Sequence, residues 1–162
     1  MQGGVVTVKS KYLVQGAVIA AVYTAVTLLL MPLSYGVMQI RVSEALTVLP
    51  ALTPAAIPGL FVGCLVSNML GPYGVIDMVL GSTATLLAAI GSYKLRKRAF
   101  LVPLPPVLAN GLVIGPMLYY VYAVPVPLWA CIFWVALGEA IACYVIGFPL
   151  LKYLSKRSSI FG

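Results

Sequence analysis

The chain has 162 residues, of which 62% are hydrophobic and only 8% are charged, and its mean hydropathy is +1.09. Soluble domains carry roughly 25% charged residues, so this composition excludes a soluble domain and predicts an integral membrane protein. Ten basic residues against three acidic ones give a net charge of +7, and histidine is absent. Without histidine, a Cys/His nucleophile and the usual zinc spacings are excluded, and Cys64, Cys131 and Cys143 are predicted to be small buried residues.

The first apolar run covers residues 12 to 31, and a membrane span needs about 20 residues. Residues 1–11 lack the order of a cleavable signal, so we expect a cytoplasmic N-terminal segment followed by a retained helix. Within this helix Ala17, Ala21 and Ala25 recur every four residues, a stripe that allows close approach of another helix. Internal packing accounts equally well for it and for the similar stripes Gly63, Ser67, Gly71 and Gly81, Thr85, Ala89.

Further apolar runs occupy residues 53–70, 74–93, 99–123 and 126–150, and basic clusters lie at 9–11, 94–98 and 152–157. Basic residues near span ends mark the cytoplasmic side of a membrane. Three runs lie between the first two clusters, but two clusters on the same side must be separated by an even number of crossings. Residues 33–51 must therefore also cross the membrane, despite Arg41 and Glu44. The sequence therefore predicts an all-α membrane protein, a compact bundle of six transmembrane helices over residues 12–154. Both termini are cytoplasmic, and residues 155–162 form a basic tail.

The basic clusters admit two partners, nucleic acid or anionic lipid. RNA-binding aromatic motifs and a soluble domain are both lacking. Attraction to anionic lipid at the inner leaflet explains the clusters, so no nucleic-acid partner is expected.

The only acidic residues, Glu44, Asp77 and Glu139, all lie within or beside apolar runs. A carboxylate at the bilayer centre costs roughly 2.5 to 3.5 kcal/mol, which makes these residues the first candidates for a binding site. In the predicted topology they gather with three further polar residues in the outer half of the membrane. These are Arg41, Asn68 and Asn110. The arrangement predicts a pocket open to the exterior.

Each candidate has a structural alternative. Arg41 and Glu44 are three residues apart, so on a helix they could neutralise each other, while Asp77 could cap a helix. Asn68 and Asn110 could form hydrogen bonds between helices. Glu139 is flanked by small residues with no local cation, so either a ligand or Arg41 from across the bundle must meet it.

Aromatic residues collect at the predicted outer ends. Membrane interfaces are rich in tyrosine and tryptophan, which predicts an anchoring role, while one of these rings could instead cap a planar ligand. The residues are Tyr35, Tyr73, Tyr119, Tyr120, Tyr122 and Trp129.

Four segments together resemble the QueT family of queuosine-precursor transporters. They are RVSEALTVLP (41–50), AIPGLFVGCLVSN (56–68), GVIDMVLGSTATLLAA (74–89) and GEAIACYVIGFPL (138–150). The resemblance implies the substrate-binding S component of an energy-coupling-factor (ECF) transporter, with a transmembrane T component and two ATPase subunits as partners. It also implies that the stripe Ala17, Ala21 and Ala25 meets the T component. No GxxxxGK[ST] phosphate loop occurs, so ATP would be used by the partners, with no cofactor in this chain and no enzymatic activity of its own.

The implied ligand is a 7-deazaguanine such as prequeuosine base, whose aminomethyl group is a cation, or queuine. A carboxylate accepts two hydrogen bonds from the guanine-type edge, a role we assign to Glu139. Asp77 or Glu44 would meet the cation, and Asn110, Asn68 or Arg41 the ring carbonyl. Two rival functions are a solitary proton-coupled carrier and an intramembrane enzyme using Glu139 and Asp77. The enzyme lacks an activated nucleophile or metal cluster, and the carrier lacks a visible inverted repeat.

Overall fold

The computed structural model describes residues 3–35 and 40–157, and every element in these ranges is helical. The chain begins with the long helix α1 (Gly3–Leu29) and the short helix α2 (Met31–Ser34), followed by the 3-10 helix η1 (Val42–Ala51). Helices α3 (Ala56–Met69) and α4 (Gly74–Lys94) come next, then the 3-10 turn η2 (Ala99–Leu101) and α5 (Leu104–Tyr120). The last rod consists of α6 (Leu128–Ala140), the π-helix η3 (Ile141–Gly147) and α7 (Phe148–Ser155).

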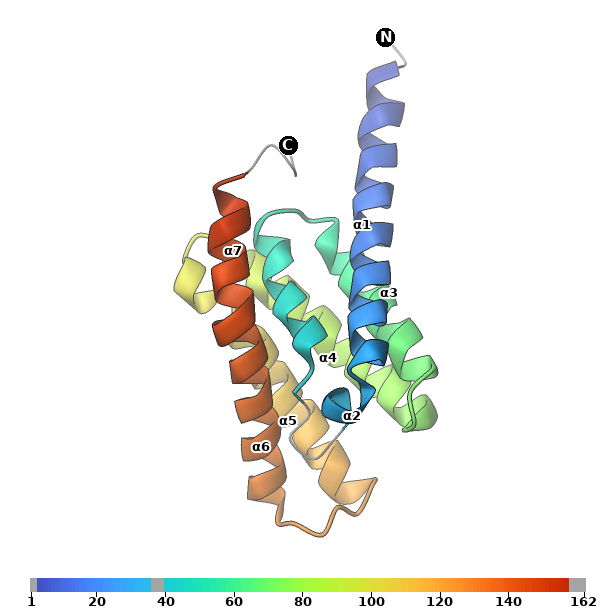
Figure 1. Ribbon diagram of the computed structural model, residues 1–162, viewed down its shortest axis with the longest axis vertical. Coiled ribbons are helices and arrows are strands. Elements are labelled where there is room, and N and C mark those ends of the chain that lie inside the picture. Colours follow the sequence, from blue (N-terminus) through green and yellow to red (C-terminus); the bar gives the residue numbers. More distant parts are fainter. Residues whose placement is uncertain (1–2, 36–39, 158–162) are drawn as a thin grey trace.

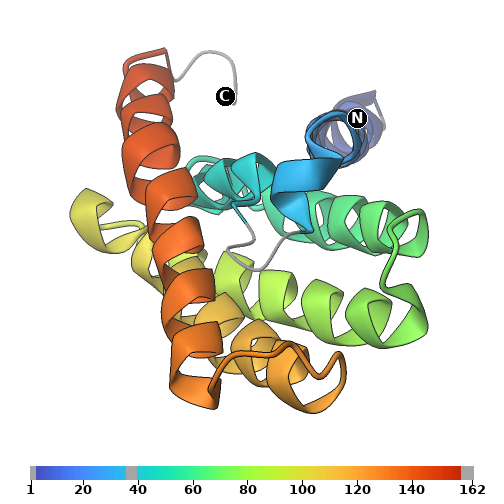
Figure 2. The ribbon, with the colours of Figure 1, turned by 60° about the horizontal axis from the view of Figure 1, so that its bottom comes forward.

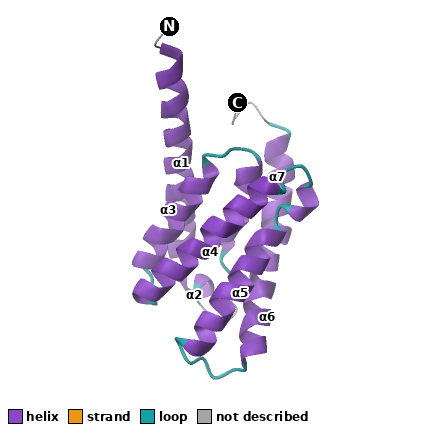
Figure 3. Ribbon diagram, turned by 180° about the vertical axis from the view of Figure 1, so that it is seen from behind, coloured by secondary structure: helices purple, strands orange, loops and turns teal. Residues whose placement is uncertain are grey.

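The helices form one bundle in which α3, α4, α5 and the last rod run in alternating directions (Figure 1). The first residues of α1, the η2 turn and the end of α7 lie toward one end of the bundle (Figure 1). The α3–α4 and α5–α6 connections lie toward the other end, as the view from behind also shows (Figure 3). The basic clusters at 9–11, 94–98 and 152–157 thus lie toward one end, as the predicted topology requires.

Within the described part of the chain, four helical segments are long and apolar enough to cross a membrane: Ser10–Leu29, Gly74–Lys94, Ala99–Tyr120 and Leu128–Ser155. Val42–Ala51 and Ala56–Met69 are apolar but shorter. The all-helical membrane fold is therefore confirmed, while the six crossings and the cytoplasmic termini remain predictions. Residues 33–51 differ from the expected continuous helix, because α2 ends at Ser34 and η1 begins only at Val42.

The expected boundaries also shift at both ends of the chain. Helix α1 begins at Gly3, so the residues expected to precede the first helix extend it instead, and its N-terminal part projects beyond the other helices (Figure 1). Helix α7 ends at Ser155. Most of the predicted basic tail, residues 158–162, lies outside the described residues, as do residues 36–39 of the predicted second crossing.

Small residues allow the helices to approach closely, as expected where association in lipid depends on packing. A Cβ atom added to Gly59 would lie 2.6 Å from the carbonyl oxygen of Gly16, so α1 and α3 touch at their backbones. A Cβ atom on Gly147 would similarly lie 2.8 Å from the carbonyl oxygen of Ala45, which brings η3 against η1. These contacts place η1 inside the bundle, between α1, α4 and the last rod (Figure 2).

Candidate binding site

All six polar residues singled out from the sequence are buried in the bundle. At most 2% of each side chain is exposed: Arg41, Glu44, Asn68, Asp77, Asn110 and Glu139. They come from five helical elements, namely the start of η1, α3, α4, α5 and the end of α6. We call these six residues the polar cluster.

Arg41 and Asp77 form an ion pair, with Nη2 of Arg41 3.4 Å from Oδ2 of Asp77. The predicted alternative in which Arg41 neutralises Glu44 on one helix face is wrong. Arg41 is the residue before η1 and has an extended backbone (φ −80°, ψ 94°), so its side chain turns away from that helix toward α4. Its guanidinium also lies 5.1 Å from the centre of the Tyr35 ring, and Nε donates to the carbonyl of Ser34 at 3.4 Å. Asp77, in the first turn of α4, is thus the partner of a buried cation. The alternative that it caps the helix is wrong, because Tyr73 is the N-cap of α4 and no side chain forms a cap hydrogen bond there.

Asn68 holds helices α3 and α4 together. Its Nδ2 donates to the carbonyl oxygen of Asp77 at 3.1 Å and contacts the sulfur of Cys64 at 3.4 Å. Its Oδ1 accepts a hydrogen bond from the Tyr35 hydroxyl at 3.2 Å. Since every polar atom of this amide has a protein partner, the interhelical role expected as an alternative is the one the structure supports.

Glu44 has one satisfied oxygen and one unsatisfied oxygen. Oε1 accepts hydrogen bonds from the hydroxyl of Tyr23 in α1 and from Oγ1 of Thr85 in α4, the latter at 3.0 Å. Oε2 is buried and has no partner. Sequence analysis did not assign Tyr23 or Thr85 to the site, because single hydroxyl groups in apolar helices carry no distinctive pattern.

Glu139 lies at the end of α6, directly before the π-helix, a feature often found at functional sites. The thiol of Cys143 donates to the Glu139 carboxyl group, with the sulfur 3.8 Å from Oε2. The alternative of an ion pair with Arg41 is not formed. Glu44 and Glu139 are near enough to interact electrostatically, and the amide of Asn110 lies close to both carboxyl groups. Nδ2 of Asn110 nevertheless makes no hydrogen bond of regular geometry, and it is buried.

The outer aromatic residues divide into two groups. Tyr119, Tyr120 and Trp129 are 39%, 72% and 71% exposed, which suits the expected anchoring role. The others, Tyr35, Tyr73 and Tyr122, pack against one another, with ring centres 5.8 Å apart in the first pair and 4.6 Å apart in the second. Tyr122 donates to the carbonyl of Tyr73, and Tyr73 to that of Tyr35. This second group covers the Arg41 side of the polar cluster.

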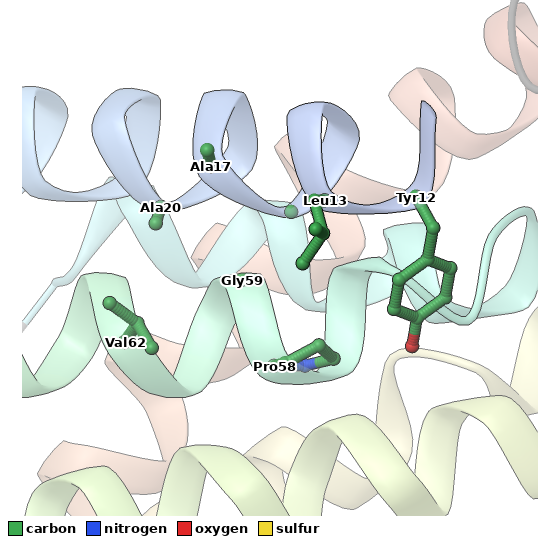
Figure 4. Close-up of a pocket in the computed structure, with 8 residues that line it drawn as sticks. Tyr12, Leu13, Ala17, Ala20, Pro58, Gly59 and Val62 are labelled. Atoms are coloured by element: carbon green, nitrogen blue, oxygen red, sulfur yellow. The ribbon is translucent and has the colours of Figure 1, made fainter. Parts of the chain in front are cut away.

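The three small-residue stripes differ in their exposure. Ala17, Ala21 and Ala25 are exposed on α1, whereas Gly63 and Gly81 are buried against neighbouring side chains. Beside Ala17 runs a groove of about 170 Å³ between α1 and α3 (Figure 4). It is apolar and contains no member of the polar cluster. Its lining residues are Tyr12, Leu13, Gly16, Ala17, Ala20, Pro58, Gly59 and Val62.

An all-helical membrane protein with a buried, incompletely satisfied set of polar side chains has the architecture of a small-molecule transport protein, since intramembrane ionisable groups mark substrate and ion pathways. The comparison with known families gives the particular assignment. A family described as QueT transporter matches residues 13–156, most of the chain, and the protein belongs to this family of membrane transporters. Neither the curated proteins nor the solved structures contain a match.

Proposed function

We propose that this QueT transporter is the substrate-binding S component of an ECF importer and takes up a queuosine precursor, a 7-deazaguanine. The main support is that the polar cluster contains buried side-chain atoms without hydrogen-bond partners. Three buried atoms lack partners: Oε2 of Glu44, Oδ1 of Asp77 and Nδ2 of Asn110. A buried polar atom without a hydrogen bond costs about 1 to 3 kcal/mol, so such atoms are natural contacts for a polar ligand.

The unsatisfied atoms match the chemistry of an aminomethyl 7-deazaguanine. Glu139, whose Oε2 is contacted by the weak thiol donor of Cys143, would accept two hydrogen bonds from the N–H donors of the guanine-type edge. Nδ2 of Asn110 is a free donor for the ring carbonyl. Because Asp77 already neutralises Arg41, Glu44 is the better partner for the ligand's ammonium group. In this arrangement Asn68 and Arg41 position the site and do not contact the ligand.

Energy for uptake would come from other chains. The sequence has no phosphate-binding loop, so we propose a T component and two ATPase subunits as partners. The exposed stripe Ala17, Ala21 and Ala25 is the proposed surface for the T component, because small residues let a second helix approach. Both termini are proposed to be cytoplasmic, next to the ATPases.

Substitution of Glu139 tests the ligand. Glu139→Gln keeps the shape of the side chain but places a donor opposite a donor, which should cost on the order of 2 to 5 kcal/mol of binding. Calorimetry with 7-aminomethyl-7-deazaguanine should therefore show affinity reduced at least about thirtyfold. Cys131→Ser, on the same helix but outside the polar cluster, is the control variant and should bind normally. A folded Glu139→Gln protein with unchanged affinity, or a wild type that prefers riboflavin or thiamine, contradicts the assignment.

Substitution of Ala21 tests the partner surface. Ala21→Trp should leave ligand binding by the isolated protein intact while abolishing uptake and weakening co-purification with the T component and ATPases. Leu112→Trp, at a position 64% exposed on α5, is the matched control and should leave uptake unchanged. Normal uptake by Ala21→Trp would place the docking surface elsewhere, and uptake by the wild type in cells without ATPase subunits would favour a solitary carrier.

A further inference from the structure

The polar cluster contains more acid than base. Its formal charge is +1 from Arg41 and −3 from Glu44, Asp77 and Glu139, a sum of −2 if all four are ionised. The one cation is 3.4 Å from Asp77. Glu44 and Glu139, which are 0% and 2% exposed, have no ion pair within the described residues. The sulfur of Cys143 lies 3.4 Å from the carbonyl oxygen of Glu44 and 3.8 Å from Oε2 of Glu139, which places the two glutamates next to each other.

Hydroxyl, thiol and amide groups surround this carboxyl pair. They come from each element packed against it, and among them only Arg41 is positively charged. They are Tyr23 from α1, Arg41 at the start of η1, Cys64 from α3, Thr85 from α4, Asn110 from α5 and Cys143 from η3. Such neighbours satisfy one carboxylate in part, but they do not neutralise two.

Two neighbouring buried carboxyl groups, neither of which forms an ion pair, do not both ionise, because each would be a desolvated charge facing a like charge. Such a pair shares one proton and titrates as a unit. Oε2 of Glu44 and Nδ2 of Asn110 are buried next to the carboxyl pair and lack hydrogen bonds of regular geometry. A ligand bound beside the pair would supply their missing partners. Oε2 would accept a hydrogen bond from a donor group on the ligand, and Nδ2 would donate one to an acceptor group.

We propose that the polar cluster binds its ligand as a cation and that binding releases the proton held by Glu44 and Glu139. The inference rests on the proposed function and narrows its ligand to 7-deazaguanines that carry an amine. In the binding step the carboxyl O–H bond breaks and its proton passes to the solvent. The ligand ammonium keeps its own proton and replaces the lost positive charge. The charge of the site is thus the same before and after binding.

The expected consequence is that affinity depends on pH and on ligand charge. Release of one proton strengthens binding about tenfold for each unit of pH, over the range in which the free carboxyl pair holds its proton and the amine stays protonated. The neutral analogue 7-cyano-7-deazaguanine has the same ring edge but no ammonium group. It should bind more weakly at neutral pH, and its affinity should not rise with pH.

Calorimetry on the full chain in detergent measures the released proton directly. Titrating 7-aminomethyl-7-deazaguanine in buffers of low and high ionisation enthalpy at one pH should give binding enthalpies that differ by about one buffer ionisation enthalpy per ligand. The nitrile should give the same enthalpy in both buffers. In Glu44→Gln and in Glu139→Gln a single carboxylate remains, so the residual binding of the amine should release no proton.

The outcomes separate this inference from the proposed function. Binding of the amine with an enthalpy independent of buffer, or equal binding of amine and nitrile, overturns the inference and leaves the 7-deazaguanine assignment intact. Proton release that persists in both glutamine variants also overturns it, because the proton would then come from another group. Failure of the wild type to bind either 7-deazaguanine overturns the proposed function together with the inference.

Discussion

The ion pair between Arg41 and Asp77 gives a prediction for stability whose size follows from its burial. With 2% and 0% of the two side chains exposed, removal of one partner leaves a desolvated charge and should cost about 3 to 5 kcal/mol. For a chain of 162 residues each kcal/mol lowers the melting temperature by about 2 to 4 °C. We therefore expect Arg41→Gln to melt roughly 6 to 20 °C below the wild type.

The two partners should not be equivalent. Among the side chains that the structure describes, Arg41 is also the only cation near Glu44 and Glu139, so its loss leaves three carboxyl groups without compensation. Arg41→Gln should consequently destabilise more than Asp77→Asn, and the double variant should melt above Arg41→Gln alone, because the pair is removed as a unit.

Thermal melting of the purified variants in one detergent provides the measurement. Arg96→Gln is the matched control, since this arginine is exposed and its loss should change the free energy of unfolding by no more than about 0.5 kcal/mol. The argument from the buried pair is refuted if Arg41→Gln has the same melting temperature as Arg96→Gln. It is also refuted if the decrease in the double variant equals the sum of the decreases in Arg41→Gln and Asp77→Asn.

Three further predictions concern the site, the packing and the topology. A Cβ atom on Gly81 would lie 2.5 Å from Nδ2 of Asn68, so Gly81→Ala should displace that amide and weaken ligand binding by about 1 to 3 kcal/mol in calorimetry; unchanged affinity would exclude a positioning role for Asn68. A Cβ atom on Gly115 would lie 2.7 Å from Cα of Ile132, so Gly115→Ala should separate α5 from α6 and lower the melting temperature, which an unchanged melting curve would contradict. Ala99→Cys, exposed in η2, should resist an impermeant thiol reagent in intact cells when the native cysteines are absent; labelling from outside would disprove the predicted topology.

Burial of the polar cluster could be predicted from the sequence because the energetics of a membrane leave few choices. Glu44, Asp77 and Glu139 lie in apolar stretches, and a charged group in such a stretch must face the bundle interior. The same reasoning could not find the partner of Arg41. That partner depends on the break between α2 and η1, which gives Arg41 an extended backbone and directs it to α4.

The contributions of hydroxyl and thiol groups were also beyond sequence reasoning. Tyr23, Cys64, Thr85 and Cys143 surround the carboxyl groups, but such residues are ordinary in membrane helices and show no spacing of their own. The small-residue stripes were ambiguous for a similar reason. Only the packing of the helices distinguishes the exposed stripe that includes Ala21 from the buried stripes.

Helix α1 connects the two proposed surfaces of the protein. On its inner face the hydroxyl of Tyr23 donates to Glu44 and Oγ1 of Thr27 donates to Oγ of Ser43, so this face is hydrogen-bonded to two consecutive residues of η1. Its outer face carries Ala21 and Ala25, each within two residues of those contacts. A ligand that changes the charge or position of Glu44 therefore acts on a hydrogen bond to the same helix that would meet the T component. Helix α1 also touches α3 backbone to backbone at Gly59, so a shift of α1 toward α3 at this contact would require α3 to shift as well. If the proposed function holds, occupancy of the polar cluster and the surface offered for docking are linked through α1.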